Sequence, residues 1–312
     1  MFPLRADSAK TPARRFRGAA GVFVFAALFL PACRPAPAVH AAAAPERSAR
    51  GAPLAGEALL EEVQERTFRW FWELTNPTNG LVPDRWPTKS FSSVAAIGFG
   101  LTAYPIGAER GWISREDARE RTATTLRFLT RAPQGPSARG MTGYKGFFYH
   151  FLDMDSGVRF KDVELSTIDT TLLMAGVLTS LSYFERDDPQ EREIRSLADA
   201  LYRRVEWDWA QPHPPLVNHG WQPESGFLPH DWGGGGYDES MILYVLALGS
   251  PTHPIAAGAW PSVTRTFRWE AFHGQEYIPF RPLFGYQYAH VWIDLHGIQD
   301  EFTRARGIDY FE

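Results

Sequence analysis

The stretch IDTTLLMAGVLTSLSYF, residues 168–184, decides the class of fold. Its apolar residues fall on every side of a helical repeat, which is the pattern of a helix buried on all faces. Such a helix must be surrounded by other elements, because burial of its apolar side chains away from water is what stabilises it. We therefore expect residues 168–184 to form an inner helix of a large core.

Apolar and amphipathic segments alternate along the rest of the chain. Further apolar helices are predicted at about 93–104, capped by Ser92 or Ser93, and at about 240–248. Amphipathic or charged helices are predicted at about 57–75, 114–131 and 190–206, and a last helix at about 298–306. Few segments alternate with a period of two, apart from 146–151 and 288–295. Inner apolar helices with outer amphipathic ones predict an all-α fold, arranged as an α/α barrel with two concentric rings.

The first 56 residues have a different composition. Three arginines at positions 14, 15 and 17 precede an apolar run over 19–30, and Pro31-Ala32-Cys33 follows. The run is too short to span a bilayer, which takes about 20 apolar residues, so it is typical of a secretory signal. We expect a lipoprotein signal over 1–32 with the lipid on Cys33, an ordinary signal peptide being the alternative. Residues 33–56 would form a flexible tether and 57–312 the folded domain.

The composition limits the classes of molecule that the protein could bind. Residues 1–32 hold five basic residues and one acidic one, so the remainder carries 27 basic and 35 acidic residues, a net charge of about −8. An acidic domain is a poor candidate for binding nucleic acid or anionic lipid. Cys33 is the one cysteine of the sequence, which excludes an internal disulfide. We expect an exported monomer, periplasmic or attached to the outer membrane of a Gram-negative bacterium through the lipid alone.

Charged and aromatic residues gather in the loops before the apolar helices. They are Asp84, Arg85 and Trp86; Asp153, Asp155 and Glu164; Trp221, Glu224, Trp232, Tyr237, Asp238 and Glu239; and Tyr288, His290, Trp292, Asp294 and His296. If the inner helices run parallel, these loops meet at one rim. Carboxylates among aromatic side chains are typical of a sugar-cleaving cleft, in which one acid protonates the leaving oxygen and another carboxylate activates water or attacks carbon.

Several of these residues also have a structural interpretation. Asp169 lies three residues after Ser166, so it fits a helix-capping pair. Asp238 occupies a position suited to an N-cap, and Glu239, at the start of the helix, would be favoured by the helix dipole alone. Glu164 lies two residues outside the predicted cap and has no such duty. His290 and His296 fit a core or sugar-bonding role better than metal ligation, and we predict neither a metal nor a cofactor.

Seven stretches of the sequence resemble the glycoamylase-like family, which includes bacterial endo-β-1,2-glucanases of glycoside hydrolase family 144 and a domain of cyclic β-1,2-glucan synthases. They are GLVPDRW (80–86), SVAAIGFGLTAYPIGAERGWISREDARERT (93–122), HFLDMDSG (150–157), ELSTIDTTLLMAGVL (164–178), GWQPESGFLPHDW (220–232), GYDESMILYVLALGSPTHP (236–254) and HVWIDLHGIQD (290–300). The resemblance implies an (α/α)6 barrel with an acidic cleft across one end and anomer-inverting hydrolysis.

The same resemblance implies roles for individual residues. Glu239 would be the general acid and Glu164 the general base, although the two roles could be exchanged. Asp155, Asp169 and Asp238 are the further candidate carboxylates. Residues expected to line the sugar subsites are Arg85, Trp221, Trp232, Tyr237, His290 and Trp292. Shelter by Trp232 and Tyr237 would raise the pKa of an acid at Glu239 by desolvation.

One departure from the family pattern affects the expected activity. Family members continue past a segment like GIDYFE (307–312), so we expect this chain to lack the helices that complete the barrel and to expose apolar flanks of its inner ring. A glucan hydrolase is therefore weighed against an oligosaccharide-binding lipoprotein without catalysis and against a transglycosylase. The linkage cleaved and endo or exo action depend on subsite geometry, which no sequence pattern here reveals.

Overall fold

The computed structural model describes residues 56–311. The predicted signal over 1–32, Cys33 and the tether up to residue 55 lie outside the described residues. None of the helices between Gly56 and Phe311 has both the length and the apolar character needed to cross a membrane.

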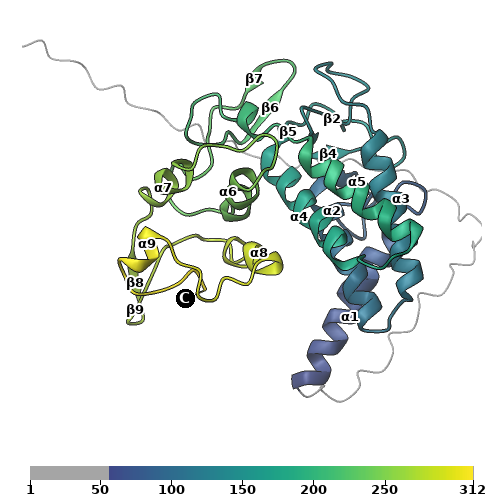
Figure 1. Ribbon diagram of the computed structural model, residues 1–312, viewed down its shortest axis with the longest axis horizontal. Helices are drawn as coiled ribbons and strands as arrows, with labels where there is room; N and C mark the ends of the chain where they lie inside the picture. Colours follow the sequence, from purple (N-terminus) through teal and green to yellow (C-terminus); the bar gives the residue numbers. More distant parts are fainter. Residues whose placement is uncertain (1–55, 312) are drawn as a thin grey trace, which may run out of the picture. The chain divides into compact units, whose positions relative to one another are not determined.

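Helices dominate the described part of the chain (Figure 1). Their bounds are α1 Gly56–Leu74, α2 Val94–Glu109, α3 Arg115–Arg131, α4 Thr167–Tyr183, α5 Pro189–Arg203, α6 Met241–Leu248, α7 Ala259–Thr264, α8 Phe284–Trp292 and α9 Glu301–Arg304, with a 3-10 turn η1 at Trp207–Ala210. The predicted helices at 57–75, 114–131, 168–184 and 240–248 are confirmed to within one or two residues. The predicted helix at 93–104 extends to Glu109, with Pro105 inside it.

The inner helices are α2, α4 and α6, whose side chains are buried around most of their circumference. Helix α2 packs on α4 so closely that glycine is required at the crossing. A Cβ atom on Gly98 would lie 2.1 Å from the carbonyl oxygen of Leu172, and one on Gly176 would lie 2.1 Å from the carbonyl oxygen of Gly98. Contact between the two backbones fixes the relative position of the helix starts, where the site is located.

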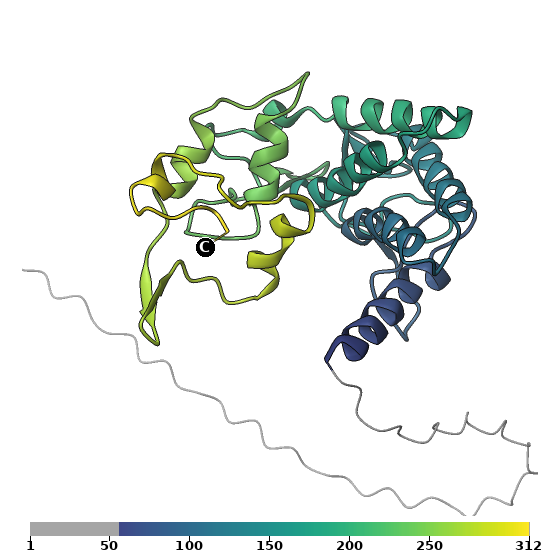
Figure 2. The ribbon, with the colours of Figure 1, turned by 60° about the horizontal axis from the view of Figure 1, so that its bottom comes forward.

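Two amphipathic helices, α3 and α5, cover α2 and α4 (Figures 1 and 2). Helix α3 begins with the capping box that the sequence predicts, in which Ser114 and Asp117 bond each other's backbone N–H groups. Arg115 at its start forms an ion pair of 3.0 Å with the buried Glu191 of α5. Paired with an arginine, this buried carboxylate joins the two outer helices rather than destabilising them.

Short strands correct the expectation of an all-α fold. They are β1 Ser92–Ser93, β2 Gly143–Tyr144, β3 Phe147–Tyr149, β4 Phe151–Leu152, β5 Leu165–Ser166, β6 Gly220–Gln222, β7 Gly226–Phe227, β8 Glu270–Phe272 and β9 Gln275–Tyr277. Five of them form an antiparallel sheet in the order β2-β3-β5-β6-β7. Each strand has only two or three residues, too few to show the period-two pattern that identifies strands in a sequence.

The C-terminal region differs most from the prediction. The segment 288–295, read as an alternating piece in a loop, lies largely within α8, and α7 and the hairpin β8–β9 were not predicted. The last helix, expected over 298–306, is only α9, Glu301–Arg304. Aromatic residues are frequent in 284–292 and their spacing resembles a strand, but packing of α8 against α6 decides in favour of a helix. Large apolar side chains are exposed at Ile106, Val245 and Val291.

Candidate active site

Glu164 lies where the sheet meets the start of α4. It directly precedes β5, the central strand, whose Leu165 pairs with Trp221 of β6. The segment before it is held by Arg159, whose side chain is only 2% exposed and forms a bidentate ion pair with Glu224 at 2.7 and 3.1 Å. Arg159 also donates a hydrogen bond of 2.7 Å to the carbonyl of Val163. The backbone that carries the Glu164 carboxylate is therefore fixed on both sides.

His150, between β3 and β4, touches two of the candidate carboxylates. Its Nδ1 lies 2.7 Å from Oε1 of Glu164, and its Nε2 lies 3.5 Å from Oδ1 of Asp169. The backbone of His150 also donates a hydrogen bond of 2.9 Å to the carbonyl of Glu164 and accepts one from the first residue of α2, Val94. Its ring packs 3.9 Å from that of Phe151. Two strands and the starts of α2 and α4 thus meet at one imidazole.

Asp169 combines the two roles that the sequence left open. Its backbone N–H donates to the N-cap hydroxyl of Ser166, and that hydroxyl donates in turn to the Asp169 carboxylate, so capping is confirmed. The second carboxylate oxygen faces His150. The side chain of Asp169 is 11% exposed, against 29% for Glu164 and 31% for His150. The cluster is therefore open to solvent on the side of Glu164 and His150.

Glu239 approaches the same cluster from the turn before α6. The helix begins at Met241 with Ser240 as its N-cap, so Glu239 precedes the helix instead of beginning it and Asp238 is not the N-cap. Asp238 holds the turn, because its carboxylate accepts hydrogen bonds from the backbone N–H of Gly233 at 2.7 Å and of Ser240 at 3.0 Å. The charges of Asp169 and His150 both act on Glu239. Glu239 thus shares Asp169 and His150 as electrostatic neighbours with Glu164.

The two glutamates differ in protonation. Burial raises the pKa of Glu239 to about 7, and the charges of Asp169 and Asp238 act in the same direction. Burial also acts to raise the pKa of Glu164, but its hydrogen bond with His150 and the charge of that ring outweigh burial and hold the pKa below its ordinary value. Near neutral pH the site therefore offers one carboxylic acid and one carboxylate, the pair that acid/base hydrolysis of a glycoside needs.

Two of the predicted sugar contacts, Trp232 and Trp221, pack on the elements that carry Glu164 and Asp169. Trp232 donates a hydrogen bond of 2.9 Å from its indole to Thr167, the first residue of α4, and stacks on His219 at 3.8 Å. Trp221 lies opposite Leu165 in the sheet and packs on Tyr144 and Trp209. Both indoles are half-buried, and these contacts fix their orientation.

Three residues that the sequence analysis did not assign as site residues also face the cluster. His150 is the first. Tyr288 of α8 is the second, because burial raises the pKa of its phenol and the charges of Glu239 and Asp169 raise it further. Asp84 is the third, since its charge acts on His150. Asp84 and Tyr288 stand in the loops that the sequence analysis noted for their charged and aromatic residues, so the sequence carried a signal for both. For His150 the only signal was its position in the HFLDMDSG stretch that resembles the family.

Two predicted residues lie in another hollow. Asp155 is exposed, and with Arg85 it lines a hollow of about 710 Å³. The side chain of Arg85 pairs with Asp84, 2.5 Å away. Trp86, 63% exposed, lines the same hollow. Among the described residues, the contacts of the acid cluster do not include Asp155, so the structure does not support it as a third acid. Arg85 instead borders the cluster through its partner Asp84.

The remaining predicted sugar contacts are directed elsewhere. Tyr237 donates a hydrogen bond of 3.0 Å to the carbonyl of Gly285 and stacks on Tyr286, so it joins the turn before α6 to α8. His290 is exposed and lines a hollow of about 240 Å³ that Tyr237 also borders. Trp292 donates a hydrogen bond of 2.9 Å to Thr102 in the middle of α2. Tyr237 and Trp292 connect α8 to the turn before α6 and to α2, and among the described residues no hydrogen bond, ion pair or ring contact joins these three side chains to Glu164, Asp169 or Glu239.

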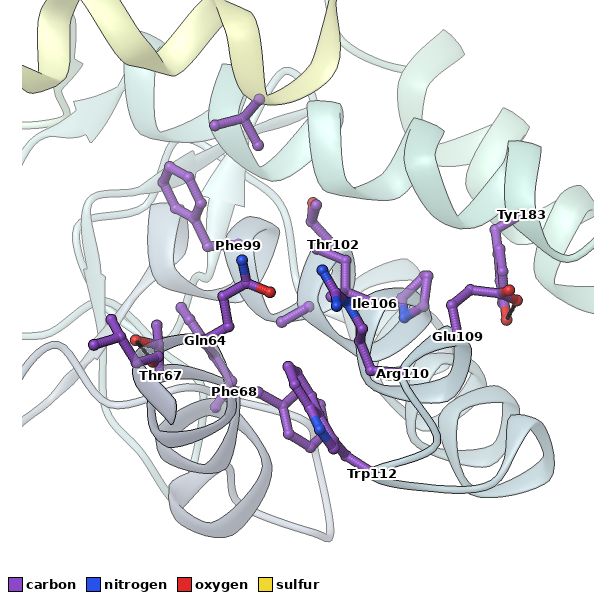
Figure 3. A pocket seen from close by; sticks show the side chains of 15 residues that line it. Gln64, Thr67, Phe68, Phe99, Thr102, Ile106, Glu109, Arg110, Trp112 and Tyr183 are labelled. Atoms are coloured by element: carbon purple, nitrogen blue, oxygen red, sulfur yellow. Dashed lines mark hydrogen bonds between the residues drawn. The ribbon is translucent and has the colours of Figure 1, made fainter. Parts of the chain in front are cut away.

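An apolar hollow of about 700 Å³ lies apart from this chemistry. Figure 3 shows it between α1 and α2, with Phe68, Ile106 and Trp112 on its walls. Among the described residues that line it, Glu109 is the one carboxylate, and the hydroxyl of Tyr183 donates to it at 2.7 Å. A single paired acid on an apolar wall lacks the second group that glycoside hydrolysis requires. Within residues 56–311 no cluster of three metal-ligating side chains is found.

The sequence matches a family model described as "Putative glucoamylase" over residues 229–312. The resemblance to the glycoamylase-like family is confirmed. A relative from Parabacteroides distasonis, an exo-β-1,2-glucooligosaccharide sophorohydrolase acting at the non-reducing end, is 29% identical over 299 residues, which cover 85% of this chain and 39% of that protein.

Solved structures of β-1,2-glucanases have a similar fold. The endo-β-1,2-glucanase from Chitinophaga pinensis, solved with sophorotriose and glucose, matches with a TM-score of 0.68 and 25% identity over 80% of this chain and 63% of that chain. A β-1,2-glucanase from Parabacteroides distasonis matches with a TM-score of 0.70 and 27% identity over 80% and 39%. The chain therefore spans less than two thirds of the length of these relatives.

Proposed function

We propose that the protein is a glycoside hydrolase that cleaves β-1,2-glucan by general acid/base catalysis. The observation that carries the proposal is that Glu164 and Glu239 share Asp169 and His150 as neighbours in opposite environments: burial raises the pKa of Glu239 to about 7, whereas the hydrogen bond with His150 holds the pKa of Glu164 below its ordinary value. Names of the relatives support the substrate, because three of them act on β-1,2-linked glucose.

Glu239 donates its proton to the glycosidic oxygen as the bond to the leaving sugar breaks. Glu164 accepts a proton from a water molecule that attacks the anomeric carbon from the opposite face, which inverts the configuration. Aromatic faces at Trp232 and Trp221 hold the sugar rings beside the two carboxylates. The exposed indole of Trp86 offers a further stacking surface where Arg85 and Asp84 approach His150.

The proposal also covers the complete fold, the export and the lipidation of the protein. Inner helices α2, α4 and α6, covered by α3 and α5, are part of an (α/α)6 barrel of which residues 57–312 form one domain. Residues 1–32 direct export, Cys33 carries a lipid, and the protein acts as a monomer in the periplasm or at the outer membrane. The support for export and lipidation is the basic, apolar and Leu-Pro-Ala-Cys pattern of the sequence.

The decisive experiment measures new reducing ends during incubation of the chain with β-1,2-glucan. Substitutions Glu239→Gln and Glu164→Gln should each lower the rate by about 10²–10⁴-fold, since each removes one partner of the proton transfer. Exposed Glu185, remote from the cluster in sequence, gives the control variant Glu185→Gln, which should keep the wild-type rate. Proton NMR of the fresh product should show the α-anomer if configuration inverts.

Other outcomes point to other functions. Wild-type rates in both variants would show that the site is wrongly assigned. Binding of the glucan without new reducing ends would identify an oligosaccharide-binding protein. Longer or cyclic products would identify a transglycosylase.

A further inference from the structure

His150 is the side chain that lies between two carboxylates of the acid cluster, those of Glu164 and Asp169. It contacts Glu164 through one ring nitrogen at 2.7 Å and faces Asp169 through the other at 3.5 Å. An imidazole with a hydrogen-bonded carboxylate at one nitrogen and a second carboxylate near the other has an environment that favours the doubly protonated ring. His150 is therefore suited to carry a positive charge between two acids.

The position of this imidazole is fixed independently of the acids. Its backbone joins Glu164 in one direction and Val94 of α2 in the other. Its ring lies against Phe151, which packs in turn on Phe91 at 4.2 Å. A ring held by backbone and aromatic contacts determines where the Glu164 carboxylate must lie, because the hydrogen bond between them has one short, directional geometry.

We propose that His150 is a positioning residue of the hydrolase, which orients Glu164 toward the attacking water and keeps it ionised through a charge-assisted hydrogen bond, while Asp169 holds the opposite edge of the ring. The inference rests on the proposed function for its kinetic part. In this arrangement Asp169 acts on Glu164 through His150, its charge also acts directly on Glu239, and Glu239 supplies the proton for the leaving group.

The charges around His150 support this division. Burial acts to lower the pKa of His150, but its hydrogen bond with Glu164 and the charges of Asp169, Glu164 and Asp84 raise the pKa above its ordinary value. Glu239 also feels the charge of the ring, and Arg159 adds a positive charge on the side of Glu164. Acids thus face the imidazole from the loop before β1, from the segment before β5, from α4 and from the turn before α6.

A kinetic series separates positioning from a structural role. Replacement by alanine, His150→Ala, should lower kcat by about 10–100-fold with little change in KM, the effect of losing one hydrogen bond to a charged group. The acid limb of the pH profile should move to higher pH, because the Glu164 carboxylate loses its partner. A change in packing alone would lower the rate equally at every pH.

Two amide variants test which nitrogen matters. The amide of His150→Asn reaches the position of Nδ1 beside Glu164, whereas that of His150→Gln reaches the position of Nε2 beside Asp169. We expect the asparagine variant to retain more activity than the glutamine variant, and added imidazole to restore part of the rate of His150→Ala, since the site is open to solvent. Equal rates in both amide variants, or a His150→Ala enzyme with the wild-type pH profile, would overturn the proposal.

An NMR titration of the His150 ring does not depend on hydrolysis. In the wild-type chain the ring should stay protonated to higher pH than in the unfolded chain, and in Glu164→Gln its pKa should fall. If the wild-type chain cleaves no glucan yet the titration behaves in this way, the proposed function fails and the pairing of His150 with Glu164 stands. An unchanged His150 pKa in Glu164→Gln would contradict the pairing itself.

Discussion

At the scale of single residues, the main feature of the site is that two glutamates, Glu164 and Glu239, have pKa values shifted in opposite directions. Glu239 and Glu164 are both half-buried glutamates, and the difference between them is the neighbour. Acids surround Glu239, whereas an imidazole contacts Glu164. The sign of the nearest charge therefore decides which glutamate can donate a proton and which can accept one.

This difference predicts a pH-dependent change in stability for Glu239→Gln. The folded-state pKa of Glu239 is about 7 and its ordinary value is 4.5. The native state therefore holds the proton more tightly than the unfolded state, and this contribution to stability is present below pH 4.5 and lost as pH rises through 7. The variant should equal the wild type at pH 4 and exceed it by about 1–2 kcal/mol at pH 8, allowing for solvent screening.

Chemical denaturation of both proteins at the two pH values measures this difference. The matched control is the same substitution at an exposed position, Glu185→Gln. A Glu239→Gln variant that is less stable than the wild type at pH 8 would contradict the assignment of a raised pKa.

The sequence identified part of the site for a physical reason. Glu164 and Glu239 stand just outside apolar helices, where a charged residue with no capping role is conspicuous. His150 lies between Tyr149 and Phe151 in a run of buried aromatic residues, so its local pattern resembles a strand of the core. Its two carboxylate partners come from later segments, and only the pairing of β3 with β5 brings them together. Asp155 lines a separate hollow, because sequence proximity to a helix does not give the direction of a side chain.

At the scale of elements, the crossing of α2 and α4 sets the position of the acids. Gly176→Ala should lower the free energy of unfolding by about 1–3 kcal/mol, because the new methyl group would lie 2.1 Å from the carbonyl oxygen of Gly98 and the helices must separate. Alanine alone would favour the helix by up to about 1 kcal/mol, so a net loss reports the clash. Urea unfolding followed by circular dichroism gives the measurement.

Gly235→Ala is the matched control for this crossing. No atom lies within 4 Å of the position that a Cβ on Gly235 would take, so the stability of this variant should remain within about 0.5 kcal/mol of the wild type. If Gly176→Ala were as stable as Gly235→Ala, the close contact of the two helices would be wrong.

Element boundaries were predictable where capping chemistry marks them. Ser93, Ser114 and Ser166 each accept a backbone hydrogen bond at the start of a helix, and the predicted starts of α2, α3 and α4 agree with the structure. Helix α8 begins at Phe284, its N-cap Leu283 provides no side-chain hydrogen bond, and four of its nine residues are Phe, Tyr or Trp. Its sequence lacks both local signals of a helix, so tertiary packing had to supply the answer.

At the scale of the whole described chain, Trp292 connects the C-terminal helices to the first inner helix. Trp292→Ala should reduce the free energy of unfolding by about 2–4 kcal/mol, since it removes the hydrogen bond to Thr102 and the ring contact with Phe99 at 5.0 Å. Exposed Trp86 gives the matched control, because Trp86→Ala should leave stability within about 0.5 kcal/mol of the wild type. Thermal unfolding distinguishes the two.

The effects of the same two variants on KM should be the reverse of their effects on stability. Trp86→Ala should raise KM for β-1,2-glucan through loss of a stacking surface, while Trp292→Ala measured well below its melting temperature should leave KM near the wild-type value. Loss of stability in Trp86→Ala with an unchanged KM would reverse the roles given to these indoles.

The hydrogen bonds of the Asp238 carboxylate affect which insertions the glycine-rich turn can tolerate during evolution. The carboxylate accepts hydrogen bonds from the backbone N–H groups of Gly233 and Ser240, and so connects the two ends of the glycine-rich turn. The entropy of closing a loop grows only slowly with length, so residues could be inserted at Gly234 and Gly235 without moving Glu239. New substrate preferences could then evolve in that turn while the proton donor keeps its place.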